Sequence, residues 1–126
     1  MSTRKPNPED AFTIERHGDI TVIVATPALE RLKFGLEEQA AELILRPLER
    51  EEDPLIIFDL GRVDFFGSMF LALLIRCWKL ALSRGGSMAL CGVTPRTREL
   101  LRITSLDIVW PLYATRQEAI EAFELD

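Results

Sequence analysis

Few side chains in this sequence have the type and spacing that chemistry requires. The one histidine, His17, falls in a predicted turn, so a histidine base would have to act from the tip of a hairpin. Cys77 (in LLIRCWKLA) and Cys91 (in SMALCGV) each lie in an apolar run, where a buried free thiol is the usual state. Because no Cys or His residues are paired at ligand spacing, and the acidic run EREED is typical of a solvated helix end, we predict no metal site.

Asp59 and Asp64 are the remaining candidates for acid-base catalysis. Neither carboxylate has a histidine, a lysine or a metal-binding companion nearby in the sequence. Gly85 and Gly86 follow a predicted helix, whereas nucleotide-binding loops place their glycines between a strand and the next helix. We therefore predict that the protein is not an enzyme and binds no cofactor.

Ser68 is the hydroxyl in the most informative position. In FDLGRVDFFGSMFLALL, a short connection leads from a buried strand through Gly67 and Ser68 to the start of an apolar helix. Ser68 could cap that helix by accepting a backbone N–H, a role worth about 1 kcal/mol. The positive end of a helix also favours a phosphate, which would add about 1.5 to 2 negative charges. The two roles are compatible, and the residues leave both open.

Composition points to one soluble domain. The chain has 126 residues, 48% of them hydrophobic and 28% charged, which suits a single globular unit. We expect a flexible N-terminal arm over 1–11 and a domain over 12–126. The net charge of −5 disfavours nucleic acid and anionic membranes as partners. The polar start MSTRKPNPED has no apolar secretion or anchor segment, so we expect a cytoplasmic protein.

Apolar spacing and turn signals predict five strands and four helices. The fold class is α/β, a single mixed sheet with an N-terminal antiparallel hairpin followed by alternating helices and strands with parallel crossovers. Pro47 should kink or end the first helix near Arg46. The predicted elements are two strands around a turn at 17–19, a helix over 29–49 with apolar Leu32, Leu36, Ala40, Leu43 and Ile44, a strand over 55–58, a helix over 68–83, a strand from Met88 to Val93, a helix over 95–104 capped by Thr94, a strand over 109–112, and a helix over 116–123 capped by Thr115.

The helix over 68–83 has two distinct faces. One face is an apolar stripe of Phe70, Leu74, Cys77 and Ala81, broadened by Leu71, Ile75, Trp78 and Leu82. The opposite face carries Met69, Ala72, Arg76, Lys79 and Ser83 at three-and-four spacing, which predicts one exposed strip. This strip is a candidate partner surface, and an ordinary solvated face is the alternative.

Two segments, IIFDLGRVDFFGSMFLALL and RGGSMALCGVTPRTRELLRITSLDIVWPLYATRQEAI, resemble a STAS domain, the family that includes anti-sigma factor antagonists. The resemblance covers about 12–123. In that family a loop of the form Asp-Ser-Ser-Gly-Leu precedes the partner-binding helix, and Gly67, Ser68, Met69, Phe70 and Leu71 stand in those places here. The resemblance implies that Ser68 matches the serine phosphorylated by a cognate anti-sigma kinase.

The resemblance also implies a function. It predicts a non-enzymatic regulatory module of a partner-switching pathway that binds an anti-sigma factor or switch-protein serine kinase, or a STAS-type partner. A homodimer stays open. The alternative is a STAS-like scaffold or sensor subunit that assembles without phosphorylation, which the departures at Gly67, Met69 and Phe70 favour. The candidate partner interface is Asp64, Gly67, Ser68, Met69, Ala72, Arg76 and Lys79.

Overall fold

The computed structural model describes residues 11–31, 37–64 and 67–125. Most of the predicted N-terminal arm therefore lies outside the described residues. Ala11, the first residue described, is fully buried, and its carbonyl accepts a hydrogen bond of 2.9 Å from the Thr26 N–H.

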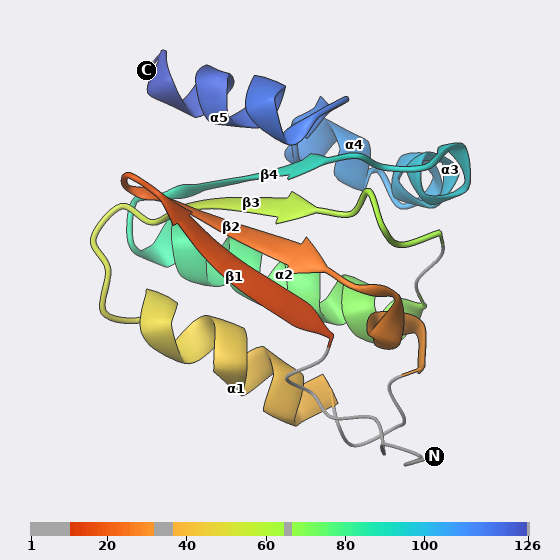
Figure 1. Ribbon diagram of the computed structural model, residues 1–126, viewed down its shortest axis with the longest axis horizontal. Helices are drawn as coiled ribbons and strands as arrows, with labels where there is room; N and C mark the ends of the chain where they lie inside the picture. The colour runs from red at the N-terminus through yellow and green to blue at the C-terminus, as the bar shows by residue number, and fades with distance from the viewer. Residues whose placement is uncertain (1–10, 32–36, 65–66, 126) are drawn as a thin grey trace, which may run out of the picture.

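A mixed five-stranded sheet forms the centre of the molecule (Figure 1). Its strands lie in chain order: β1 (Phe12–His17), β2 (Ile20–Ala25), β3 (Leu55–Asp59), β4 (Ser87–Cys91) and β5 (Leu112–Tyr113). The β1–β2 pair is antiparallel, and each later pair is parallel. Gly18, with φ of +61°, supplies the left-handed conformation in the hairpin turn. The predicted fold class is confirmed.

The helices cover both faces of the sheet. Figure 1 shows α1 (Glu37–Leu48) and α2 (Ser68–Ser83) against one face and α5 (Arg116–Glu124) against the other. The helices α3 (Pro95–Ile103) and α4 (Leu106–Val109) follow β4 at one end of the sheet. Thr94 and Thr115 cap α3 and α5 by accepting the N–H of Thr97 and Glu118, as predicted.

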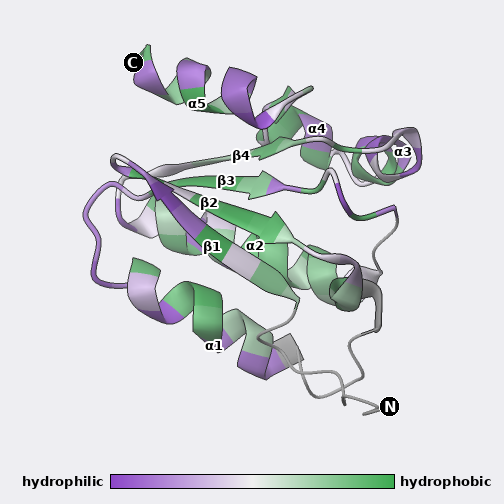
Figure 2. Ribbon diagram, viewed as in Figure 1, coloured by the Kyte–Doolittle hydropathy of each residue, from purple (hydrophilic) through white to green (hydrophobic). Residues whose placement is uncertain are grey.

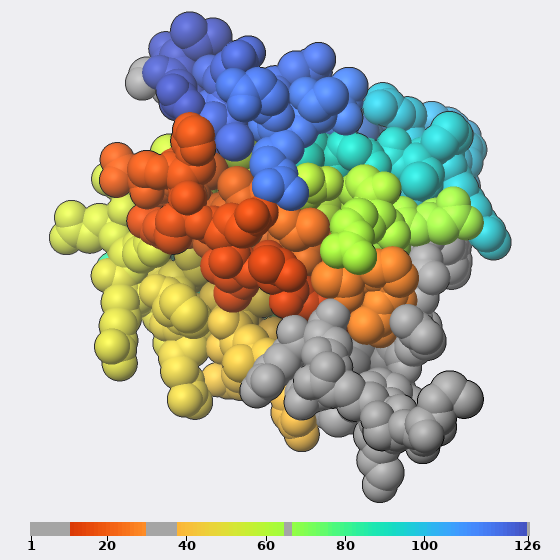
Figure 3. Space-filling model, viewed as in Figure 1, coloured from red at the N-terminus to blue at the C-terminus, as the bar shows by residue number. Residues whose placement is uncertain are grey.

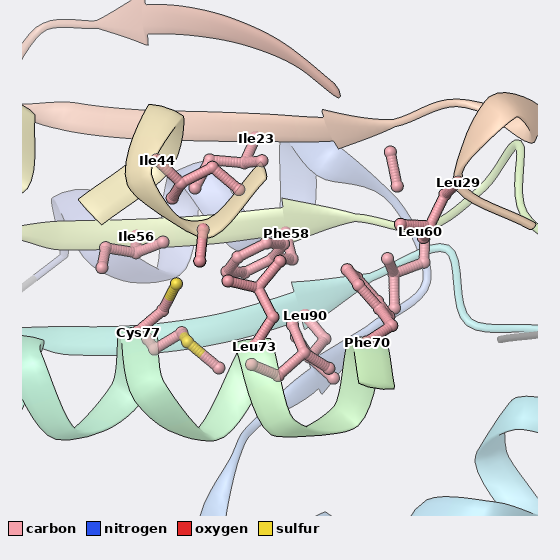
Figure 4. Packing of buried hydrophobic residues seen from close by; sticks show 14 of the residues in the cluster. Ile23, Leu29, Ile44, Ile56, Phe58, Leu60, Phe70, Leu73, Cys77 and Leu90 are labelled. Atoms are coloured by element: carbon pink, nitrogen blue, oxygen red, sulfur yellow. The ribbon is translucent and has the colours of Figure 1, made fainter. Parts of the chain in front are cut away.

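Two apolar clusters, one on each face, hold these layers together. The larger cluster packs the α1 and α2 helices on side chains such as Ile23, Phe58 and Leu90 (Figure 4). The smaller one packs Ile120 of α5 on strand residues that include Ile57. Hydrophobic residues therefore run along β2 and β3 (Figure 2). Each such side chain stabilises the fold by about 1.5 to 3 kcal/mol when fully buried.

The helix predicted over 29–49 is divided differently in the structure. A 3₁₀ helix, η2, spans Pro27–Arg31, and the α-helix over Glu37–Leu48 follows, while Leu32 and Leu36 lie outside the described residues. The helix ends at Leu48, two residues past the predicted stop, because Pro47 in a last turn costs only one backbone bond. Leu43 was placed on the apolar stripe but is 42% exposed, since the buried side runs through Ala40, Ala41, Ile44, Leu45 and Leu48.

The strand predicted over 109–112 is wrong in its first half. Val109 ends the short helix α4, which was not predicted, and the Trp110 N–H donates to the Leu106 carbonyl at 2.9 Å. Pro111 has no N–H to donate, but its carbonyl accepts the Leu90 N–H at 3.0 Å, so strand pairing begins there. Strand β5 is then only Leu112–Tyr113. The preceding strand, β4, ends at Cys91, before the predicted Val93.

Candidate functional site

The connection between β3 and α2 (residues 60–67, of which 65 and 66 lie outside the described residues) is tied to the sheet at its start. The Leu60 N–H donates to the Cys91 carbonyl at 2.9 Å, and the Val63 N–H donates to the Leu60 carbonyl at 3.1 Å. The Leu60 and Val63 side chains are each only 1% exposed. Burial of these two residues fixes the path by which the chain leaves the sheet.

The start of α3 holds the middle of the same connection. The Thr94 hydroxyl donates to the Asp64 carbonyl at 3.1 Å and accepts the Thr97 N–H at 3.2 Å. One threonine thus caps α3 and contacts the connection. Asp64 itself is exposed, as an interface residue has to be.

Ser68 is the first residue of the 16-residue helix α2. The N-cap position belongs to Gly67, which makes no side-chain cap bond. The capping role considered for Ser68 is therefore wrong, because a capping side chain has to precede the first helical residue. The Ser68 side chain is exposed, and the first turn of α2 carries no acidic residue. The positive end of the helix is thus not neutralised by its own side chains.

Phe70 fixes the orientation of this first turn. Its ring stacks on Phe12 at 6.1 Å between ring centroids and meets Phe58 edge-on at 6.1 Å. Figure 4 shows Phe70 pointing from α2 toward the sheet. Because Phe70 points inward, the neighbouring Ser68 and Met69 point outward, and Met69 is 42% exposed. The family departure at Phe70 is thus a change in the core and not on the surface.

The exposed strip predicted on α2 is confirmed as a surface. It consists of Met69, Ala72, Arg76, Lys79 and Ser83, all exposed. Arg76 also reaches across to α1, where its Nη1 lies 2.9 Å from the Glu38 Oε1. On the opposite side, Leu82 was predicted as part of the apolar stripe but is 53% exposed, whereas Leu73, which was not predicted, is buried. The use of this strip as an interface stays a prediction.

The strip belongs to a basic part of an acidic protein. Residues 60–106 contain seven basic side chains and two acidic ones, whereas the rest of the chain contains eight basic and eighteen acidic. The positive residues are Arg62, Arg76, Lys79, Arg84, Arg96, Arg98 and Arg102. The part of the sequence that contains the β3–α2 connection and α2 is therefore suited to an acidic partner.

Asp59, at the end of β3, is engaged by other protein groups. Its Oδ1 accepts the Gly61 N–H at 3.0 Å, and its Oδ2 accepts the Arg116 Nε at 2.9 Å. Burial lowers the pKa of Arg116, but its bond and charge contact with Asp59 outweigh burial and hold that pKa above its usual value. Asp59 is thus a structural partner, and Arg116 is a residue of this region that sequence reasoning missed.

The two thiols are buried and free. Burial raises the pKa of Cys77 to about 12. Burial, and then the charge of Asp59, raises the pKa of Cys91 to about 12. Both are thus protonated at neutral pH, when a thiol is a poor nucleophile. Among the described residues, no group of three or more His, Cys, Asp or Glu side chains is placed to hold a metal ion.

The fold defines a class, that of small α/β domains with a mixed sheet in which an exposed serine opens the helix after the central strand. The sequence model of the STAS domain matches residues 7–119, and the chain belongs to this family. Within the described part of the chain, no helix is both long and apolar enough to cross a membrane.

Known proteins similar to this chain include antagonists of anti-sigma factors. An anti-sigma F factor antagonist of Paenibacillus polymyxa is 23% identical over 116 residues, 89% of this chain and 93% of that protein. The solved anti-sigma-factor antagonist (STAS) domain protein from Planctomyces limnophilus is 37% identical, with a TM-score of 0.79 over 88% of this chain and 96% of that one. The Bacillus cell fate determinant SpoIIAA in its phosphorylated form shares the fold, with 22% identity and a TM-score of 0.70 over 90% and 99% of the two chains.

Proposed function

We propose that the protein is a non-enzymatic regulatory module of a partner-switching pathway, acting as an anti-sigma factor antagonist in the cytoplasm. Its partner is an anti-sigma factor of the serine-kinase type, which it binds through the β3–α2 connection and the exposed strip of α2. The names of the similar proteins from Paenibacillus polymyxa and Planctomyces limnophilus support this class of function.

The observation that carries the proposal is the position of Ser68. Its hydroxyl is exposed at the first residue of α2, where the family resemblance places a phosphorylated serine. A kinase can reach a hydroxyl there without unfolding the chain, and the adjoining Met69 offers apolar surface for contact. The same residue is thus accessible as a substrate and central to the docking face.

Phosphorylation at Ser68 would work as a release signal. A phosphate adds about 1.5 to 2 negative charges and a tightly held hydration shell. Docking would have to remove that water beside Met69 and Ala72, and a charge buried without a partner is costly. The excess of basic side chains in 60–106 favours an acidic partner, and such a partner would in addition repel the phosphate. Both effects act in the same direction, toward dissociation.

The docking face can be tested with charge substitutions and a matched control. Met69→Asp and Lys79→Glu alter the strip, whereas Leu125→Asp places the same charge on an exposed apolar residue next to the end of α5. We expect the first two to weaken binding to the purified cognate kinase by roughly tenfold or more. Leu125→Asp should leave the affinity unchanged. If Met69→Asp and Lys79→Glu bind the kinase as tightly as Leu125→Asp and the wild type do, α2 is not the interface.

A second function, that of a scaffold or sensor subunit which assembles without phosphorylation, is favoured by Gly67 and Met69. These two residues replace the acidic residue and the second serine of the family loop, and both lie at the surface. In that case Ser68→Ala and Ser68→Asp would bind the same partner as the wild type with the same affinity. The same would hold if the partner is a second copy of this chain.

A further inference from the structure

The Asp59 carboxylate joins two distant parts of the chain. Its Oδ1 accepts the N–H of Gly61, the second residue of the β3–α2 connection, at 3.0 Å. Its Oδ2 lies 2.9 Å from both Nε and Nη2 of Arg116, at the start of α5. The Arg116 Nη1 continues to the Glu15 Oε2 on β1 at 2.7 Å. In Figure 3 the surfaces of β1 and α5 adjoin, as this contact requires.

We propose that Arg116 is a positioning residue for the β3–α2 connection and acts through Asp59. The inference rests on the proposed function, because it takes this connection as the docking element. Arg116 itself is not proposed to contact a partner. It sets the orientation of the Asp59 side chain, and Asp59 in turn holds the backbone that leads to Ser68.

The surroundings of Asp59 make the orientation of its side chain depend strongly on Arg116. The Asp59 side chain is only 17% exposed, and Cys91 beside it is buried as a neutral thiol. Without the Arg116 guanidinium, the carboxylate would be a poorly solvated charge without its cation. Rotation toward water would restore its solvation, but the same rotation would take Oδ1 away from the Gly61 N–H.

The backbone at Gly61 has little room to compensate. An added Cβ at Gly92 would lie 2.9 Å from the Gly61 Cα and N, so the turn after β4 already touches Gly61. Leu60 and Val63 on either side are buried. Loss of the Asp59 bond would therefore show as local opening of residues 61–64.

Backbone amide hydrogen exchange, measured by NMR on the full chain without any partner, tests the proposal. Arg116→Gln removes the charge and should speed exchange at Gly61 by about 10- to 100-fold, the range for a lost bond to a charged acceptor. Arg116→Lys keeps a cation and should restore at least part of the protection. Arg16→Gln is the control, because it removes an arginine from another ion pair of the same protein, the more exposed one with Glu51. That control should leave Gly61 unchanged.

Three results would overturn the proposal: unchanged exchange at Gly61 in Arg116→Gln, the same change in Arg16→Gln, or a uniform increase that includes the central amide of Leu90. The last would mean general loss of stability. Affinity for the kinase, measured separately on the same variants, then tells the two proposals apart. Normal Gly61 exchange combined with binding that depends on Met69 would refute only the role of Arg116.

Discussion

The substitution Gly92→Ala should disturb the candidate site, because the turn after β4 lies against the β3–α2 connection at Gly61. Gly92 has a φ of +70°, and a Cβ there would lie 2.9 Å from two backbone atoms of Gly61. Gly18, in the hairpin turn, has a similar φ of +61° but no atom within 4 Å of the added Cβ. Gly92→Ala and Gly18→Ala therefore share the conformational cost and differ only in the steric contact.

The two costs can be separated in magnitude. A left-handed conformation costs a residue with a Cβ about 1–2 kcal/mol, which is the whole effect expected for Gly18→Ala. Overpacking adds about 1–3 kcal/mol, and here the obstacle is backbone, which cannot rotate away as a side chain can. Gly92→Ala should thus lower the free energy of unfolding by about 2–5 kcal/mol.

Urea unfolding of both variants, followed by circular dichroism, gives the two free energies of unfolding. Two-dimensional NMR of the same samples should show shifted amide signals for 61–64 in Gly92→Ala and not in Gly18→Ala. Equal losses of stability in the two variants, within about 0.5 kcal/mol, would refute the close contact between Gly92 and Gly61.

Two further predictions concern the same region. Thr94→Ala should cost about 1–2 kcal/mol, by urea unfolding, and should alter the NMR signals of Asp64, whereas Thr115→Ala should have a similar cost with no effect at Asp64. The raised thiol pKa values of Cys77 and Cys91 mean that the folded state keeps two protons which the unfolded state loses above pH 9. The contribution of the two thiols to the free energy of unfolding should thus be constant below pH 9. It should fall as the pH rises from about 9 to about 12, by up to about 1.4 kcal/mol per pH unit for each thiol. Urea unfolding at pH 8 and pH 10.5 measures the fall, and a double Cys→Ala variant that falls as steeply would contradict it.

Regular patterns in the sequence predicted most of the fold. The short apolar run that became β3 and the stripe of Phe70, Leu74, Cys77 and Ala81 each match one structural period, so strand and helix followed from spacing alone. The caps Thr94 and Thr115 were predictable because capping depends on local residue types. Spacing was less informative near Pro47 and Pro111, where a missing N–H shifts an element's end by an amount that tertiary contacts decide.

The candidate site was predictable only where it is local. The exposure of Ser68 and of the α2 strip followed from helical periodicity. The bounds of α2 were predicted correctly, but its capping residue was not, because Gly67 and Ser68 are both good residues for an N-cap and only the backbone geometry selects one. The link from Asp59 to Arg116 joins residues 57 positions apart, so nothing in local sequence indicated it. It depends on α5 packing with its first turn over the end of β3.

If Ser68 is the switch of a docking face, its substitution should change which proteins are captured from native lysate. Wild type, Ser68→Ala and Ser68→Asp would be used as baits, with mass spectrometry of the captured proteins and of Ser68 itself. We expect wild type and Ser68→Ala to capture a serine-kinase anti-sigma factor and Ser68→Asp to lose it, with phosphate found on Ser68 of the wild type. Capture of the same proteins by all three baits, with Ser68 never modified, would contradict this role of Ser68.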